Sequence, residues 1–195
     1  KIEGMFAFAI VDKTSFVVHL ARDRFGEKPL YMHGGNRFFS FSSDLNALVK
    51  SNDRSTEIDP LSLSRYLALH FIPGNRSIWQ NYERVLPGER VEINLGDLSY
   101  NKTLYYQLPA NKENSFDPDQ LNELIEDSIN TRLMGDVPVG VFLSGGLDSS
   151  IVTSLAAKHS SRIETFSIGF DSNQHDESFY ARVVAKNCGV NHHNV

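Results

Sequence analysis

The sequence predicts two domains, a strand-rich first part and a second part in which helices and strands alternate. Residues 1–110 contain short apolar runs separated by Gly, Pro and Asn, a pattern typical of antiparallel sheets. Residues 111–195 alternate helical and strand patterns, which is typical of a parallel sheet with crossover helices. A polar stretch interrupted by prolines, residues 109–118, separates the two patterns and predicts the domain boundary.

Apolar runs predict the strands of the first part. Residues 5–11 form a short apolar run typical of a buried strand, and residues 16–21 repeat this pattern. Residues 37–42 return as a strand after a Gly-Gly-Asn turn. Residues 90–95 alternate apolar and polar side chains, which predicts a half-buried strand, and residues 103–108 predict the last strand of this part.

Two helices and one charged segment complete the first part. Asp59 and Pro60 predict a helix that continues to about Phe71, with Asp59 as N-cap and Pro60 at the first helical position; a short helix is predicted at residues 45–49. Residues 22–31 carry five charges, as a solvated loop does. Because they lie between two strands and end in Pro-Leu-Tyr, a fixed corner held by ion pairs is an equal alternative.

The second part alternates in a regular order. The patterns predict helices at 121–133, 149–159 and 178–187, and strands at 139–143, 162–170 and 192–195. The strand at 139–143 is apolar enough to be buried. Because ligands of such sheets bind at the carboxyl ends of the strands, the segment at 144–150 falls at the predicted ligand edge.

Residues 144–150, Ser-Gly-Gly-Leu-Asp-Ser-Ser, join that strand to a helix and have the chemistry of a phosphate site. Gly145 and Gly146 lack the Cβ atoms that keep an anion from the backbone, and the free N–H groups of the helix start face the same point. The serine hydroxyls add donors, and Asp148 adds a carboxylate able to hold Mg²⁺ beside the phosphates. The alternative is a plain connection in which Asp148 or Ser149 only caps the helix. No Gly-Lys-Ser/Thr ending is present, so this is not a Walker loop.

A second position at the same edge bears on nucleotide binding. Ile168 lies near the end of the next predicted strand, and beside Leu143 it would wall an adenine pocket. Ordinary core packing of both side chains is an equal alternative.

Composition excludes several classes of protein. The 195 residues are 41% hydrophobic and 11% aromatic, enough for packed cores, and the formal charge of −5 argues against a dedicated nucleic-acid binder. No apolar run approaches the ~20 residues of a membrane span, and no signal peptide pattern begins the sequence. The single cysteine excludes an internal disulfide framework and fits a reducing compartment, so we expect a cytoplasmic protein.

Six segments, taken together, resemble the glutamine-hydrolysing asparagine synthetases. In order they are GMFAFA, ARDRFGEKPLY, LPG, DVPVG, SGGLDSS and HDES, which begin at residues 4, 21, 86, 136, 144 and 175. The resemblance implies part of an α+β N-terminal-nucleophile glutaminase fold (αββα) in residues 1–110. It implies part of an α/β ATP-pyrophosphatase (PP-loop) fold in residues 111–195. In that family the first domain releases ammonia, and a tunnel delivers it to the second, where Mg-ATP has converted aspartate to β-aspartyl-AMP.

The resemblance also implies the site residues. Those expected to bind ATP are Leu143, Ser144, Gly145, Gly146, Asp148, Ser149 and Ile168. Asp148 is expected to hold Mg²⁺, and the backbones of Leu143 and Ile168 to flank the adenine. The implied partners are the small molecules ATP, aspartate and glutamine, with no nucleic acid and no membrane, and a homodimer is left open.

The family's glutaminase nucleophile is a cysteine at the mature amino terminus, with its own α-amino group as base. Lys1 is not that residue, and Cys188, near a helix end before Gly189, is expected to be a packed core thiol. The glutamine-binding segments and the later part of the synthetase domain are also not found. We therefore expect an internal piece of a longer protein, without a catalytic residue of its own and inactive in both reactions.

Several alternatives stay open at this point. The same architecture serves β-lactam synthetases and sugar or peptide amidotransferases, and a non-catalytic nucleotide-binding homologue is a further alternative. Asp176 and Glu177 are expected to cap a helix, with a polar contact near the ATP site as the alternative. His192 and His193 are adjacent in a predicted strand and point to opposite faces, which argues against a metal pair.

Overall fold

The structure is a computed structural model, and it describes residues 2–35, 38–52, 56–110, 117–135, 137–160, 162–169 and 176–195. The chain divides into two compact units, residues 1–112 and 113–195. The predicted domain boundary, between residues 110 and 111, adjoins residues 111–116, which lie outside the described residues, so it stays a prediction. Within the described part, no helix is both long enough and apolar enough to cross a membrane.

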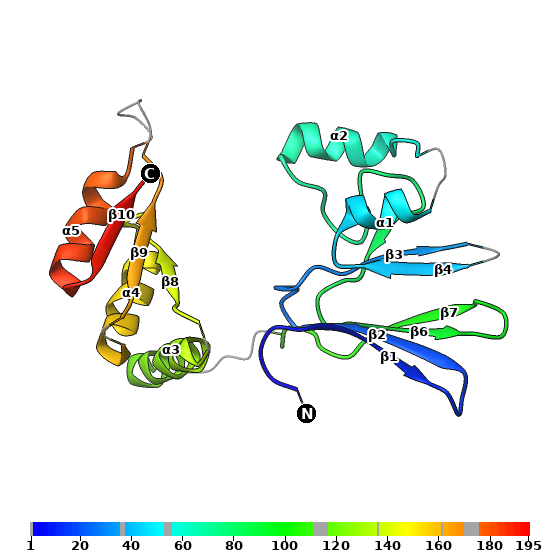
Figure 1. Ribbon diagram of the computed structural model, residues 1–195, viewed down its shortest axis with the longest axis horizontal. Coiled ribbons are helices and arrows are strands. Elements are labelled where there is room, and N and C mark those ends of the chain that lie inside the picture. The colour runs from blue at the N-terminus through cyan, green and yellow to red at the C-terminus, as the bar shows by residue number, and fades with distance from the viewer. Residues whose placement is uncertain are drawn as a thin grey trace. The chain divides into compact units, whose positions relative to one another are not determined.

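Unit 1 contains two antiparallel sheets (Figure 1). One has the strand order β1-β2-β6-β7 and the other the order β4-β3-β5. Their strands are β1 (Ala7–Asp12), β2 (Val17–Arg22), β3 (Tyr31–Gly34), β4 (Phe39–Ser42), β5 (Glu83–Arg84), β6 (Glu89–Asn94) and β7 (Tyr100–Leu104). The predicted strand at 37–42 and its Gly-Gly-Asn turn include residues 36 and 37, which lie outside the described residues.

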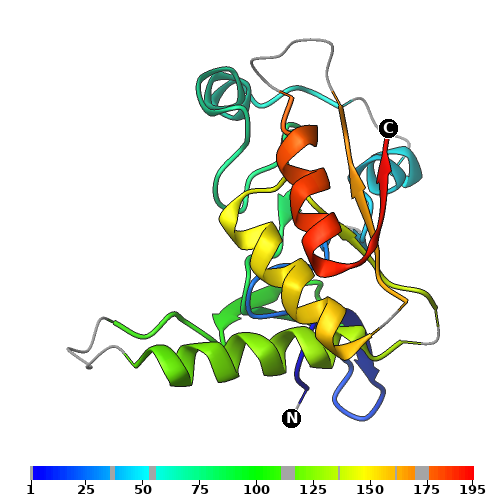
Figure 2. The ribbon, with the colours of Figure 1, turned by 90° about the vertical axis from the view of Figure 1, so that its left-hand side faces the viewer.

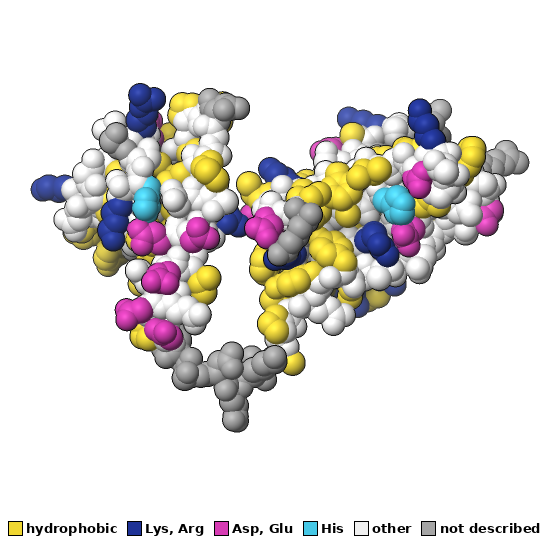
Figure 3. All heavy atoms as spheres, turned by 90° about the horizontal axis from the view of Figure 1, so that it is seen from below, with side chains coloured by type: hydrophobic (Ala, Val, Ile, Leu, Met, Phe, Trp, Pro, Cys, Tyr) yellow, Lys and Arg dark blue, Asp and Glu magenta, His cyan; other side chains and the backbone are white. Residues whose placement is uncertain are grey.

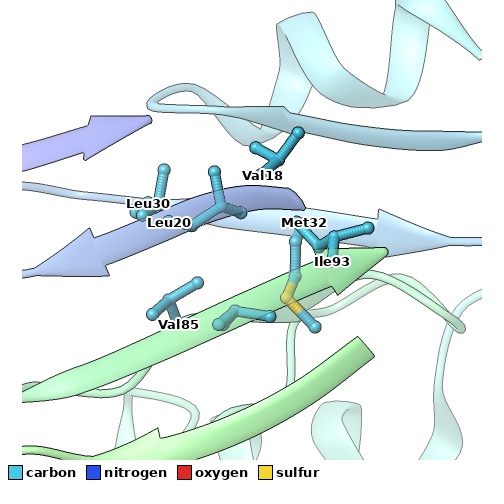
Figure 4. Packing of buried hydrophobic residues seen from close by; sticks show 7 residues of the cluster. Val18, Leu20, Leu30, Met32, Val85 and Ile93 are labelled. Atoms are coloured by element: carbon cyan, nitrogen blue, oxygen red, sulfur yellow. The ribbon is translucent and has the colours of Figure 1, made fainter. Parts of the chain in front are cut away.

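The two sheets of unit 1 share one hydrophobic core. Side chains of β2 and β6 pack against those of β3 and the segments beside it, and Figure 4 shows the side chains of this cluster between the strands. The cluster consists of Val18, Leu20, Leu30, Met32, Val85, Val91 and Ile93. The alternation predicted for residues 90–95 is confirmed up to Asn94, because Val91 and Ile93 are buried whereas Arg90 and Asn94 are exposed. It is wrong for Leu95, which follows the strand and is 42% exposed.

Two of the predicted strands of unit 1 are wrong in part. The strand at 5–11 is not buried: Ile10 and Val11 of β1 are each 54% exposed, because β1 is the edge of its sheet and pairs only with β2. The last strand is β7, residues 100–104, and not 103–108. The chain leaves the ladder after Leu104, because the N–H groups of Tyr105 and Tyr106 both donate to the Gly88 carbonyl.

The charged segment at 22–31 is a fixed corner, and backbone groups bind its two buried charges, Arg22 and Asp23. The guanidinium of buried Arg22 donates to three carbonyls, those of Gly26, Lys28 and Val85, at 2.6–2.7 Å. The Asp23 carboxylate, 1% exposed, accepts from four backbone N–H groups at 2.9–3.3 Å; the donors are Phe6, Phe25, Glu27 and Lys28. The fixed corner predicted as one alternative is therefore confirmed for Arg22 and Asp23, with backbone groups as their partners.

Unit 1 also contains two helices, α1 and α2. Helix α1 (Leu45–Ser51) packs on β3 and β4, and its N-cap Asp44 accepts from the Ala47 N–H at 2.6 Å. Helix α2 (Pro60–Leu69) has Asp59 as N-cap and Pro60 at its start, as predicted, but it ends two residues before Phe71. The carboxylate of Asp59 accepts from Ser62 and Arg76 and makes no cap bond to the helix backbone.

Unit 2 is a parallel three-stranded sheet in the order β10-β9-β8. Its elements are α3 (Pro118–Leu133), β8 (Gly140–Phe142), α4 (Leu147–His159), β9 (Glu164–Ser167), α5 (Ser178–Cys188) and β10 (Asn191–Asn194). Helices α4 and α5 lie along one face of the sheet, and α3 packs on α4 (Figure 2). The predicted alternation and the parallel pairing are confirmed.

The strand at 139–143 is not a buried strand. It is shorter, residues 140–142, and Phe142 is 84% exposed, because β8 is an edge strand that pairs only with β9 among the described residues. The next strand spans 164–167 and not 162–170, and Phe170 lies outside the described residues. Edge position, which depends on distant parts of the chain, is what the apolar pattern alone could not reveal.

Candidate phosphate-binding site

The phosphate loop, residues 144–150, leaves the carboxyl end of β8 and enters α4, as predicted. The Leu143 N–H donates to the Phe166 carbonyl at 2.8 Å, which ties the start of the loop to β9. Gly146 is the N-cap of α4, with φ −70° and ψ 168°. The predicted capping alternative is therefore wrong in its residues, since Asp148 and Ser149 lie inside the first helical turn.

Serine hydroxyls hold the loop in one shape. The Ser144 and Ser149 hydroxyls lie 3.1 Å apart, and the Gly146 N–H donates to Ser144 Oγ at 3.2 Å. Ser149 and Ser150 both donate to the Gly146 carbonyl, at 3.2 and 2.6 Å. The loop thus closes on itself around the start of α4.

The first turn of α4 presents donors to solvent. The first N–H groups of a helix have no partner within the helix, and the helix dipole places partial positive charge there. Ser144, Leu147 and Asp148 are exposed at this point, so an anion can reach the loop and the helix end together. This arrangement suits a phosphate group.

Gly145 lies against the first turn of α5. Its φ is +83°, and a Cβ added there would lie 2.5 Å from Tyr180 Cβ and 2.7 Å from the Ala181 nitrogen. The loop is therefore in close backbone contact with a second helix start. The sequence did not predict this contact. Its one local signal is that residue 145 is a glycine, the residue that adopts a positive φ without strain.

The structure separates the two side chains expected to wall an adenine pocket. Leu143 is 1% exposed and packs with Ala181 and Ala185, whereas Ile168 is 65% exposed. Leu143 is thus a core residue, as one alternative had it, and Ile168 is not. Their backbones follow the carboxyl ends of the paired strands β8 and β9, where the Leu143 N–H donates to the Phe166 carbonyl, two residues before Ile168.

The remaining candidates are structural in their contacts. Asp176 accepts from the Ser178 N–H at 3.0 Å at the start of α5, and Glu177 is the N-cap residue but makes no side-chain cap bond. His192 and His193 have different partners: His192 contacts Thr165 and Ser167, whereas His193 contacts Glu164 and stacks on Phe166. Cys188 is half-buried and not fully packed in the core, because it lies at the last position of α5.

The loop offers the Asp148 carboxylate as a ligand for a metal ion that arrives with a nucleotide. Within the described ranges, no three His, Cys, Asp or Glu side chains are grouped so as to hold a metal ion. Mg²⁺ commonly takes one or two carboxylates and completes its shell with phosphate oxygens and water. The single exposed carboxylate of Asp148, beside the helix start, matches that requirement.

Comparison with known proteins identifies the family. The glutamine amidotransferase domain family matches residues 1–106, and the asparagine synthase family matches residues 120–195. The chain belongs to the glutamine-hydrolysing asparagine synthetase family. The two matches appear in the order that the sequence segments predicted, with one in each compact unit.

Individual relatives of this family cover nearly the whole chain. A relative from Methanocaldococcus jannaschii is 35% identical over 99% of the chain, which corresponds to 39% of that relative's length. Glutamine-hydrolysing asparagine synthetase 1 from Bacillus subtilis is 36% identical over 97% of the chain and 30% of its own length. The chain thus spans between a third and two fifths of one relative and less than a third of the other.

One solved structure was also found to be similar. An NH3-dependent NAD synthetase from Campylobacter jejuni aligns with 42% of this chain and 37% of its own, at 16% identity and a TM-score of 0.35. A score at this level assigns no fold.

Proposed function

We propose that the protein containing this chain is a glutamine-hydrolysing asparagine synthetase. Its reaction would use ATP to convert aspartate to β-aspartyl-AMP, and ammonia from glutamine would then give asparagine, AMP and pyrophosphate. The observation that carries the proposal is the exposed phosphate loop at the start of α4, in a chain that also matches a glutamine amidotransferase domain. The membership of the chain in this family supports the same reaction.

The roles of the loop follow from its geometry. Transfer of the adenylyl group places charge on the α-phosphate and on the leaving pyrophosphate. The N–H groups at the start of α4 and the Ser144 and Ser149 hydroxyls are donors that would bind these oxygens. The family resemblance, and not this geometry, assigns the backbones of Leu143 and Ile168 to flank the adenine.

Asp148 would hold Mg²⁺ beside the phosphates. When bound, this ion neutralises charge on the phosphate oxygens and on the leaving pyrophosphate. Asp148 is exposed in the first turn of α4, so its carboxylate can reach an ion that arrives with the nucleotide.

The finer fold assignments belong to the same proposal. We assign unit 1 to the αββα glutaminase fold, supported by two antiparallel sheets that share a core, with α1 packed on one of them. We assign unit 2 to the ATP-pyrophosphatase fold, supported by its parallel sheet and by the loop at the end of β8. The domains would then be residues 1–110 and 111–195.

Substitution of Asp148 tests the function. In the complete gene product, we expect Asp148→Ala to abolish ATP-dependent pyrophosphate release while glutamine hydrolysis stays measurable, because only the phosphate site loses a ligand. Asp119→Ala is a matched control, since Asp119 occupies the same second position in the first turn of α3 and is also exposed. Normal pyrophosphate release by Asp148→Ala, or an equal loss in Asp119→Ala, would remove Asp148 from the site.

A product assay tests the acceptor. With ATP, ammonium and aspartate, we expect release of pyrophosphate together with asparagine. Pyrophosphate release that depends on another carboxylic acid would favour a β-lactam synthetase or another amidotransferase. Absence of any ATP consumption would favour a non-catalytic homologue.

The cellular location and the oligomeric state are also part of the proposal. A cytoplasmic location is supported by the single cysteine, half-buried and free. A homodimer, which the sequence leaves open, is the proposed oligomeric state. Fractionation of cells and light scattering of the purified gene product test these two assignments.

A further inference from the structure

We propose that a chain of hydrogen bonds between β9, β10 and α5 positions the first turn of α5 against Gly145 and so sets the shape of the phosphate loop. We call this chain the polar seam; its members are Thr165, Ser167, Asp176, Ser178, His192 and Asn194. The proposal rests on the proposed function in one respect, namely that the loop binds the phosphates of ATP.

One end of the seam lies within the sheet. His192 Nδ1 is 3.0 Å from Thr165 Oγ1, and His192 Nε2 is 3.1 Å from Ser167 Oγ. Burial lowers the pKa of His192, and the nearby Arg182 and His193 lower it further, so the ring is neutral near pH 7. A neutral imidazole donates through one nitrogen and accepts through the other, so His192 donates to one of these hydroxyls and accepts from the other. The Thr165 hydroxyl also donates to the Asn191 carbonyl at 2.9 Å.

The other end reaches the start of α5. Ser167 Oγ lies 3.0 Å from Asn194 Oδ1, and Ser178 Oγ lies 3.3 Å from the same oxygen. The one proton of the Ser178 hydroxyl is shared between Asn194 Oδ1 and the Asp176 carboxylate, which accepts from the Ser178 N–H as well. Ser178 is the first residue of α5, so the seam ends on the helix turn that carries Tyr180 and Ala181.

That turn is what the loop touches. A Cβ on Gly145 would lie within 2.7 Å of Tyr180 and Ala181 backbone atoms, so any shift of the turn moves Gly145 or opens a gap beside it. Leu143, the residue that precedes the loop, packs on Ala181 from the same helix. The loop therefore has α5 on one side and its own hydroxyl bonds on the other.

The hydroxyls of the seam are too buried to find water as a substitute. Thr165 is 0%, Ser178 2% and Ser167 9% exposed. A buried donor or acceptor that loses its partner costs free energy, and linked polar networks hold one geometry because each member constrains the next. These side chains do not touch the proposed phosphate site, so they are positioning residues and not catalytic ones.

Ser178→Ala tests the seam in the complete gene product. We expect Mg-ATP to bind about tenfold more weakly, the factor that corresponds to one displaced hydrogen bond. The KM for ATP would rise by the same factor while the KM for glutamine stays unchanged. Amides of residues 144–150 would exchange hydrogen faster, whereas those of α3 in the same unit would keep the wild-type rate. Calorimetry and hydrogen exchange measure these quantities.

Two further variants keep the result interpretable. Ser154→Ala removes an exposed hydroxyl from α4 and should leave both measurements at the wild-type level. Asn194→Ala breaks the seam at an exposed side chain, and it decides the question should Ser178→Ala fail to fold.

The outcomes separate the seam from the proposed function. Unchanged Mg-ATP affinity in both seam variants overturns the proposal. So does an unchanged hydrogen-exchange rate of the amides of residues 144–150, or an equal rise in the exchange rate of the amides of α3. If the wild-type protein binds no Mg-ATP, the proposed function is wrong. The hydrogen-exchange rates of residues 144–150 in the seam variants then test the polar seam by themselves.

Discussion

At the residue scale, three glycines of unit 2 differ in what they require. Gly145 combines a φ of +83° with backbone atoms of α5 at less than 3 Å from any Cβ. Gly189 has a φ of +67° but open space around it. Gly146 has a φ of −70°, and its nearest neighbour is the Ser144 hydroxyl at 3.3 Å from a Cβ. The series separates the cost of backbone conformation from the cost of a clash.

Alanine at each of these positions should rank accordingly. We expect Gly189→Ala to lower the free energy of unfolding by about 1 kcal/mol, the usual cost of a side chain at positive φ. Gly145→Ala should cost more and abolish Mg-ATP binding, because α5 must move. Gly146→Ala should cost less than either. Urea denaturation followed by circular dichroism checks the order, and equal effects at Gly145 and Gly189 would contradict the close contact.

At the element scale, the corner at residues 22–31 shows how backbone groups accommodate two buried charges. Burial by itself raises the pKa of Asp23, but the N–H groups of Lys28, Glu27, Phe6 and Phe25 together lower the pKa below its ordinary value of 3.8. Burial lowers the pKa of Arg22, whose guanidinium instead bonds three carbonyls. The corner joins β2 to β3 and thereby links the two sheets of unit 1.

Asp23→Asn should destabilise unit 1. An amide replaces one acceptor oxygen by a donor that faces backbone N–H groups, which costs on the order of 3 kcal/mol. Trp79, the one tryptophan of the sequence, lies in unit 1, so its fluorescence reports this unfolding. Asp97→Asn is the control, since Asp97 is an exposed turn residue that bonds only Ser99. Equal unfolding of the two variants would contradict the role of the corner.

Acid should weaken the same corner. Because the folded-state pKa of Asp23 lies below its unfolded value, the carboxylate stabilises the fold above the unfolded value of ~3.9, and this contribution is lost as pH falls through the folded pKa. We expect the Trp79 unfolding temperature to fall more steeply between about pH 5 and pH 2 in wild type than in Asp23→Asn. Parallel curves would show that Asp23 does not contribute.

At the scale of the whole molecule, the chain consists of two units that each have their own core. The cluster around Val91 and Ile93 belongs to unit 1, and the cluster around Ile129 and Leu155 belongs to unit 2. Both units also expose apolar side chains, for example Leu67 at 71% and Phe142 at 84%, and yellow patches mark such side chains on the face shown in Figure 3. Separate cores predict separate unfolding transitions.

Core truncation in one unit should therefore leave the other unaffected. Ile93→Ala should destabilise unit 1 by about 2–5 kcal/mol and shift the Trp79 transition. Leu155→Ala should destabilise unit 2 by a similar amount and shift the helical circular dichroism signal without moving the Trp79 transition. A shift of both signals in either variant would show that the units unfold together.

The sequence by itself determined the order and type of most elements, the alternation of β6, the parallel pairing in unit 2 and the place of the candidate phosphate loop between β8 and α4. These depend on periodicity and turn chemistry within a few residues. The polar seam also corresponds to a local pattern. Thr165 and Ser167 are spaced by two along one strand, and His192 and Asn194 are spaced by two along the next, so each pair lies on one face of the sheet.

Only the tertiary structure decided which strands form sheet edges, and so why β1 and β8 are exposed despite their apolar sequences. It also decided that backbone groups satisfy Arg22 and Asp23, and that α5 lies against Gly145. The reason is common to all three: burial and hydrogen-bond satisfaction depend on partners distant in the chain, and local pattern carries no information about which partners arrive.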